Sequence, residues 1–98
     1  MITPTPTRPR RPCAPPPIAY EPGYSTWYGF HQAMSAGAIE RECALAAPLG
    51  MKTLITDDGW QTDDGNRGYA FCGDWNVSPK RIPDMRCHVA AVHALGMK

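Results

Sequence analysis

Two adjacent acids near the centre of the chain are the residues best suited to chemistry. Asp57 and Asp58 follow directly after the apolar segment 52–56, and Gly59 and Trp60 come next. The leucine and isoleucine of that segment predict a parallel strand covered on both faces, whereas carboxylates cannot be buried unpaired without a large cost in desolvation free energy. The two acids should therefore lie at the C-terminal end of the strand, where they face water or a polar ligand.

Tryptophans accompany these acids. Trp27 ends a strand predicted earlier in the chain, and Asp74 and Trp75 lie in a glycine-bearing loop after the acids. Carboxylates accept paired hydrogen bonds from vicinal hydroxyls, and an indole packs well against the C–H face of a sugar ring. Acids and tryptophans at the same end of the predicted strands therefore favour a carbohydrate ligand. The candidate substrate-binding residues are Trp27, Asp57, Asp58, Trp60, Asp74 and Trp75.

The acid pair is poorly placed to be catalytic. The two carboxyl groups of a glycosidase flank the scissile bond, about 5 to 5.5 Å apart in retaining enzymes and about 6.5 to 9.5 Å apart in inverting ones. Asp57 and Asp58 are neighbours on one backbone, with Cα atoms about 3.8 Å apart, and cannot easily reach opposite faces of a sugar ring. We therefore assign both acids to substrate binding and assign no catalytic residue.

Other interpretations of these residues stay open. Asp58-Gly59 is also a common turn dipeptide, and paired acids at a strand end can hold Mg²⁺ in a doubly wound sheet. The magnesium interpretation leaves the tryptophans without a role, and the segment 57–74 lacks the acid spacing of a calcium loop. The histidines have no matching spacing and are assigned to surface or packing positions: His31, His88 and His93. The residues thus indicate no metal and no cofactor.

The elements that position the acids follow the order strand, helix, strand. A strand is predicted over 24–30, where aromatic and β-branched residues cluster. Ser35 offers an N-cap for a helix that ends at Gly50. The apolar positions of this helix recur at helical spacing: Ile39, Cys43, Ala46 and Leu49. A second strand follows at once over 52–56, and such short connections are typical of a right-handed parallel unit.

A second helix follows the long polar loop 61–81. Asp84 can cap this helix and Gly96 ends it, and its apolar face is expected to hold Met85, Val89, Val92 and Leu95. The tetrapeptide Leu-Gly-Met-Lys at 49–52 recurs at 95–98, which predicts the start of a third strand.

These elements predict the α/β class. We expect a partial (β/α)8 TIM barrel with the first two strand-helix units plus the start of the third strand, and an active site at the C-terminal ends of the strands. Because two units would leave a parallel edge exposed, we expect a larger protein around this segment.

Composition limits the other possibilities. A net charge of +1 over 98 residues argues against nucleic acid as a partner. No apolar run approaches the roughly 20 residues of a transmembrane helix, so we expect no membrane partner and a reduced, cytoplasmic compartment. The cysteines lack CxxC spacing and are expected to be free thiols: Cys13, Cys43, Cys72 and Cys87. The proline-rich residues 1–22 are expected to form a linker or disordered arm before a domain over 23–98.

Several motifs occur together in a specific order and spacing. They are Tyr24-Ser25-Thr26-Trp27-Tyr28, Ile39-Glu40-Arg41-Glu42-Cys43, Asp57-Asp58-Gly59-Trp60-Gln61, Asn66-Arg67-Gly68-Tyr69, Gly73-Asp74-Trp75 and Ile82-Pro83-Asp84-Met85. With them, residues 20–98 resemble the N-terminal part of the catalytic barrel of glycoside hydrolase family 36, the α-galactosidases.

The resemblance implies a retaining hydrolase that removes terminal α-linked galactose from a small-molecule α-galactoside through a covalent glycosyl-enzyme intermediate. Asp57 and Asp58 match the acids that hold the galactose 4- and 6-hydroxyls, and Trp27 matches a tryptophan of the same subsite. The family's nucleophile and general acid/base lie on later strands, so these residues alone are expected to be inactive. A galactosyl transglycosylase of the raffinose-synthase kind and a non-catalytic galactose-binding module stay open as alternatives. The oligomeric state is not predicted.

Overall fold

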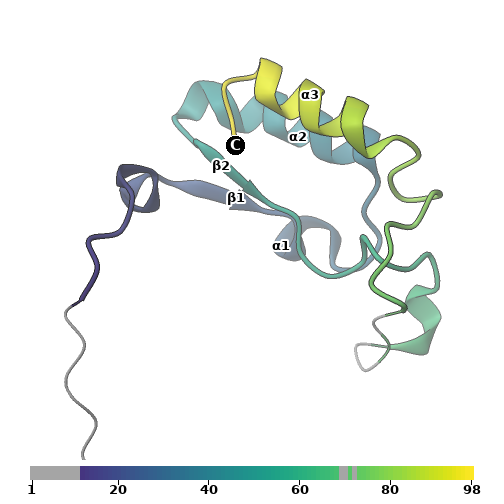
Figure 1. Ribbon diagram of the computed structural model, residues 1–98. Coiled ribbons are helices and arrows are strands. Elements are labelled where there is room, and N and C mark those ends of the chain that lie inside the picture. The colour runs from purple at the N-terminus through teal and green to yellow at the C-terminus, as the bar shows by residue number, and fades with distance from the viewer. Residues whose placement is uncertain (1–11, 69–70, 72) are drawn as a thin grey trace, which may run out of the picture.

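A two-stranded parallel sheet lies beneath two helices that run side by side (Figure 1). The structure, a computed structural model, describes residues 12–68, 71 and 73–98. The strands are β1 (Gly23–Ser25) and β2 (Thr53–Ile55), and the helices are α1 (Trp27–Phe30), α2 (Ala36–Ala46) and α3 (Met85–Ala94). Short 3-10 helices cover Pro17–Tyr20, Ala47–Leu49 and Gly65–Arg67. The first of these falls within the predicted linker 1–22, of which residues 1–11 lie outside the described residues.

β2 has neighbours on both edges. On one edge β1 pairs with it in parallel, with Tyr24 opposite Leu54. On the other edge the Lys98 N–H donates to the Lys52 carbonyl (2.9 Å), and the Leu54 N–H donates to the Lys98 carbonyl (2.7 Å). These two bonds are those of a parallel pair, so Lys98 lies where the sequence predicts a third strand to begin. Along the sheet, the segments therefore follow the order of the chain.

The predicted strand over 24–30 is wrong in its second half. β1 ends at Ser25, and Trp27–Phe30 forms the short helix α1. Thr26 already has helical backbone angles, and its carbonyl accepts a hydrogen bond from the Phe30 N–H at 3.0 Å. Aromatic and β-branched residues favour strands only where strand neighbours cover them, and here local turn bonds prevail. Trp27 consequently stands in the helix beyond the strand, instead of at its end.

α2 begins as predicted, because the Ser35 Oγ accepts a hydrogen bond from the Ala38 N–H at 3.3 Å. Its buried face contains Ile39, Cys43 and Ala46. Leu49 was expected on this face but is 78% exposed. The chain tightens into a 3-10 turn at Ala47–Leu49, which rotates the last side chain away from the core. Gly50 then ends the helix in the left-handed conformation, at φ 95°.

α3 is capped as predicted, since the Asp84 Oδ1 accepts a hydrogen bond from the Cys87 N–H at 3.0 Å. Its predicted apolar face is only partly buried. Val92 is 4% exposed, whereas the other three members are more than a third exposed: Met85, Val89 and Leu95. A groove of about 420 Å³ runs between α3 and β2, and Met85 and Val89 line it with Leu54 and Trp60.

A histidine joins the two long helices. His88 is buried at 5% exposure, as the packing assignment expected, and its Nδ1 lies 3.3 Å from the Glu40 Oε2 on α2. Around this contact α2 and α3 share one hydrophobic core with β2. The buried members of the core are Met34, Ala36, Ile39, Cys43, Ile82, Val92 and Met97.

The cysteines that the structure describes are free, as predicted: Cys13, Cys43 and Cys87. Cys72 lies outside the described residues. Burial raises the pKa of the Cys43 thiol, and Glu40 and Glu42 raise it further, so little reactive thiolate forms there at neutral pH. Within the described ranges, no helix is long and apolar enough to cross a membrane.

Asp84 gives α3 a stability that depends on pH. The backbone hydrogen bond from Cys87 lowers the pKa of the Asp84 carboxyl below its usual 3.8. Because the folded pKa lies below the unfolded one, this stabilisation is fully present above the unfolded value and is lost as pH falls through the folded value. As the pH drops below about 4, wild type should lose more thermal stability than Asp84→Asn, which keeps an uncharged acceptor. Melting curves by circular dichroism at several pH values test this, and parallel losses in both proteins would contradict it.

Candidate functional site

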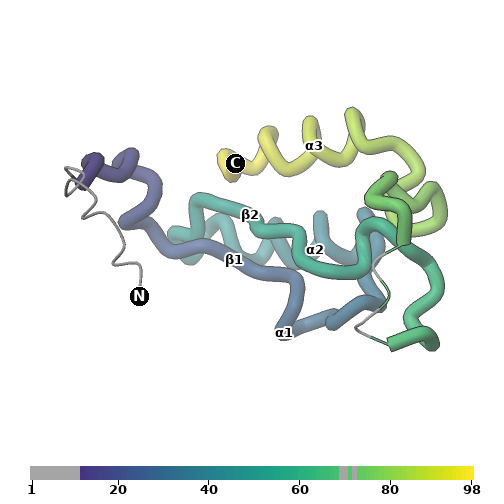
Figure 2. The backbone as a smooth tube through the Cα atoms, turned by 60° about the horizontal axis from the view of Figure 1, so that its bottom comes forward, coloured from purple at the N-terminus to yellow at the C-terminus, as the bar shows by residue number. Residues whose placement is uncertain are grey.

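Both strands leave the sheet at the same end, as Figure 2 shows, and the acids follow directly after β2. Two hydrogen bonds join the strand ends. The Thr26 N–H donates to the Ile55 carbonyl at 3.1 Å, and the Asp57 N–H donates to the Thr26 Oγ1 at 2.9 Å. Thr26 is fully buried, so this junction is part of the core. The prediction that the acids follow the C-terminal end of β2 is confirmed.

Asp58 is held by three donors. Its Oδ2 accepts a hydrogen bond from the Gln32 side-chain amide at 2.7 Å. Its Oδ1 accepts bonds from the Gln61 side-chain amide at 2.6 Å and from the Gly59 N–H at 3.1 Å. Gln32 and Gln61 are both buried. Gln32 was not predicted as a site residue, because a single glutamine in the segment after α1 belongs to no recognisable motif.

Asp57 is less constrained. Its Oδ1 accepts a hydrogen bond from the Asp58 N–H at 2.7 Å, and the side chain is half-buried. Among the described residues, its Oδ2 has no hydrogen-bond partner. A carboxylate can accept about four hydrogen bonds, so Asp57 keeps most of this capacity for a ligand.

Gly59 permits the close approach that makes this arrangement possible. Its φ of 114° lies in the region that glycine adopts readily and other residues rarely do. A Cβ atom on Gly59 would stand 2.6 Å from the Gln32 carbonyl oxygen and 2.7 Å from its Cα. The turn formed by Asp57, Asp58 and Gly59, here called the acid turn, therefore packs directly on the backbone of Gln32. The side-chain amide of Gln32 also donates a hydrogen bond to Asp58.

The tryptophans form two separate ring pairs. Trp27 stacks on His31, with ring centroids 5.1 Å apart and planes 12° apart. Trp60 meets Trp75 edge to face at 5.9 Å. Trp60 also packs against the hydrophobic core and lines the groove beneath α3, whereas Trp75 is 66% exposed. The placement of all three tryptophans around one sugar stays a prediction.

The loop that carries Asp74 and Trp75 is brought against the acid segment at Gly73. A Cβ atom there would stand 2.7 Å from the Gln61 carbonyl oxygen, and Gly73 has a φ of 64°. Asp74 is exposed and lines a shallow pocket together with Gln61. Their roles as ligand-binding residues stay predictions.

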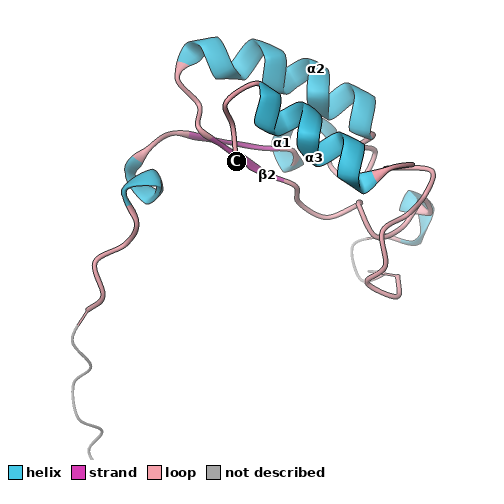
Figure 3. Ribbon diagram, turned by 45° about the horizontal axis from the view of Figure 1, so that its top comes forward, coloured by secondary structure: helices cyan, strands magenta, loops and turns pink. Residues whose placement is uncertain are grey.

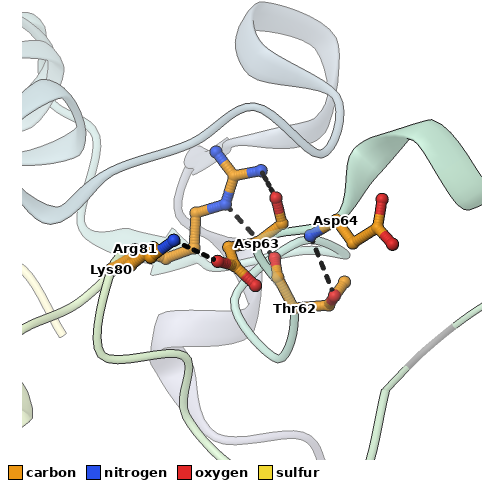
Figure 4. A network of polar contacts seen from close by, with 5 residues as sticks. All are labelled: Thr62, Asp63, Asp64, Lys80 and Arg81. Atoms are coloured by element: carbon orange, nitrogen blue, oxygen red, sulfur yellow. Dashed lines mark hydrogen bonds and ion pairs between the residues drawn. The ribbon is translucent and has the colours of Figure 1, made fainter.

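Arg81 links the loop after the acids to the segment that precedes α2. Its guanidinium donates to the carbonyl oxygens of Thr62 (3.2 Å), Met34 (3.3 Å) and Asp63 (3.4 Å), and Figure 4 shows two of these bonds. Beside it, the Lys80 Nζ lies 3.2 Å from the Asp63 carboxylate. A hydrogen bond from Lys80 lowers the pKa of Asp63, although an exposed pair of this kind adds little stability. Arg81 and Lys80 therefore hold the loop at Thr62 and Asp63 in place.

A metal ion would need a cluster of suitable ligands. In the part of the chain that the structure describes, no three His, Cys, Asp or Glu side chains come together in this way. Asp58 instead accepts hydrogen bonds from two side-chain amides, and both acids keep acceptor positions that hydroxyl groups of a neutral ligand could use.

Known proteins similar to this chain are α-galactosidases of fungi. No protein-family model matches the chain, and no solved structure matches it. Among curated proteins, it is 37% identical over 62 residues to probable alpha-galactosidase G of Emericella nidulans. It is 35% identical over 65 residues to probable alpha-galactosidase C of Aspergillus oryzae, and 32% identical over 65 residues to alpha-galactosidase C of Emericella nidulans.

The matches cover 61% to 64% of this chain, and the chain spans only 8% to 9% of the length of these relatives. A segment that covers more than half of the chain must contain the centre of the chain. Asp57 and Asp58 lie close enough to that centre to fall inside each match. The chain is thus related in sequence to one segment of the α-galactosidases, and the matched part of this chain includes Asp57 and Asp58.

Proposed function

We propose that these residues form the first part of an α-galactosidase barrel and supply part of the subsite for terminal α-linked galactose. The observation that carries this proposal is the similarity to named α-galactosidases across the acid pair. The motifs from Tyr24 to Met85 further favour glycoside hydrolase family 36 within these enzymes.

The sheet order supports a barrel. β1, β2 and Lys98 lie side by side in chain order, with all bonds parallel. Both long helices cover the same face of the sheet, as Figure 3 shows. A (β/α)8 barrel adds strands in sequence beneath one outer ring of helices, and the described elements follow that pattern. Each half of a doubly wound sheet has the same local order, and the magnesium interpretation needs the point where that order reverses, which the two strands and Lys98 do not include.

The acid pair supports a role in recognition. Asp57 and Asp58 follow β2 at the strand ends where barrel enzymes hold their substrates. We propose that they accept hydrogen bonds from the galactose 4- and 6-hydroxyls, with Trp27 beside the ring. A site built to bind an axial hydroxyl disfavours the epimer, because that sugar leaves a buried acceptor unpaired. In the proposed retaining mechanism, the nucleophile and the acid/base belong to later strands, so these residues alone select the sugar without cleaving it.

A sugar titration tests the proposal. Methyl α-D-galactopyranoside should shift the ¹H–¹⁵N NMR signals of Thr26, Asp57 and Asp58, and the 4-epimer, methyl α-D-glucopyranoside, should shift them at least tenfold less at equal concentration. No release of nitrophenol is expected from a chromogenic α-galactoside. Equal responses to the two epimers would contradict the proposed galactose subsite.

A further inference from the structure

The two acids differ in how much of their hydrogen-bonding capacity is already used. Asp58 accepts three bonds, two at Oδ1 and one at Oδ2. Asp57 accepts one, at Oδ1. With about four acceptor positions on each carboxylate, Asp58 has one left and Asp57 has three, two of them on its Oδ2. The adjacent acids are therefore not equivalent toward a ligand.

Gln61 cannot reverse its amide without losing contacts. Its Oε1 accepts a hydrogen bond from the Gly59 N–H at 3.0 Å, while its Nε2 donates to the Asp58 Oδ1 at 2.6 Å. A reversed amide would place a donor against the Gly59 N–H and an acceptor against the Asp58 carboxylate. Gln61 thus has one amide orientation, which fixes one oxygen of Asp58.

Gln32 fixes the other oxygen from a different part of the chain. It is 5% exposed, and its Nε2 donates to the Asp58 Oδ2 at 2.7 Å. Its backbone packs against Gly59, which leaves no room for the acid turn to move toward it. Hydrogen bonds between an amide and a charged carboxylate are about twice as strong as neutral ones. Together the two glutamines determine the orientation of the Asp58 carboxylate.

We propose that Gln32 and Gln61 are positioning residues of the galactose subsite, which hold Asp58 in place and leave Asp57 as the principal acceptor for the sugar hydroxyls. This inference rests on the proposed function for its ligand, and on the described hydrogen bonds for its geometry. The single remaining acceptor position of Asp58 then has a fixed place relative to the open Oδ2 of Asp57. Two hydroxyl groups on one face of a sugar fit such a fixed pair of acceptors.

Replacing the Gln32 amide by a carboxylic acid should make the affinity for the sugar depend on pH. In Gln32→Glu, a second carboxylate meets the Asp58 Oδ2, and two such groups repel each other until they share a proton. We expect affinity for methyl α-D-galactopyranoside to fall at least tenfold at pH 7 and to recover most of that loss at pH 5. His31, Asp63 and Arg81 line the same cavity as Gln32 in both proteins, so the ratio of variant to wild-type affinity isolates the new acid.

Asn76→Asp is the matched control, because it makes the same change from amide to acid at an exposed position. Its affinity should stay within twofold of wild type at both pH values. A Gln32→Glu protein that binds the galactoside as wild type does at pH 7, or that shows no recovery at pH 5, would overturn the proposal.

A measurement without sugar separates this inference from the proposed function. The side-chain amide protons of Gln32 and Gln61 should exchange slowly in wild type, Asp58→Asn should shift both sets of NMR signals, and Asp57→Asn should leave them nearly in place. Fast exchange of these amides in wild type would overturn the positioning role even where galactose binds. Slow exchange without any galactoside binding would leave the positioning of Asp58 intact and refute the proposed ligand.

Discussion

Replacing Gly59 with alanine should lower the free energy of unfolding by about 2 to 4 kcal/mol. The added Cβ atom would stand 2.6 to 2.9 Å from three backbone atoms of Gln32, which cannot swing aside as a side chain would. The φ of 114° adds strain of its own. Urea denaturation followed by tryptophan fluorescence measures the effect.

Gly50→Ala is the matched control for this substitution. Gly50 also has a positive φ, 95°, but a Cβ atom there would meet nothing within 4 Å. This control should therefore show strain alone, at about 1 kcal/mol. If both alanine variants lost the same free energy, the close approach of the acid turn to Gln32 would not be present in solution.

The second large effect is a loss of catalytic activity when Asp57 is replaced in a complete, active enzyme. The matching segment of alpha-galactosidase C from Emericella nidulans can be replaced by the corresponding segment of this chain, which includes Asp57. In that chimera, Asp57→Ala should lower kcat/KM on a chromogenic α-galactoside by at least about 100-fold. Two charge-assisted hydrogen bonds, each about 1.5 to 3 kcal/mol, supply this loss.

Asp63→Ala in the same chimera is the control, because Asp63 is an exposed acid that lies on the same loop and pairs with Lys80. Its kcat/KM should stay within about threefold of the unsubstituted chimera, as expected for a surface ion pair. A loss at Asp63 as large as that at Asp57 would point to a general effect of negative charge, and would contradict a direct contact between Asp57 and the sugar.

The sequence predicted best where one residue determines local structure. Ser35 and Asp84 cap the helices for which they were identified, because a short polar side chain satisfies an otherwise unpaired N–H group. Gly50 and Gly96 end the helices in the left-handed conformation. The two acids follow β2, because an apolar strand cannot accommodate them inside the sheet.

The sequence predicted less well where contacts between residues far apart in the chain determine the local structure. The strand propensity of 24–30 gave way to turn bonds at Thr26, and a 3-10 turn carried Leu49 to the surface. Gln32 could not be found from the sequence, because its partner Asp58 lies 26 positions further along the chain. Such residues become visible only when the fold brings two loops together.

The most direct test of a galactose subsite in this chain is the activity of the chimera without substitutions. If the segment around Asp57 and Asp58 performs the same task as in its relatives, the folded chimera should hydrolyse a chromogenic α-galactoside, and the corresponding α-glucoside should remain uncleaved. A chimera that melts cooperatively near the temperature of the parent enzyme yet shows no α-galactosidase activity would contradict the account.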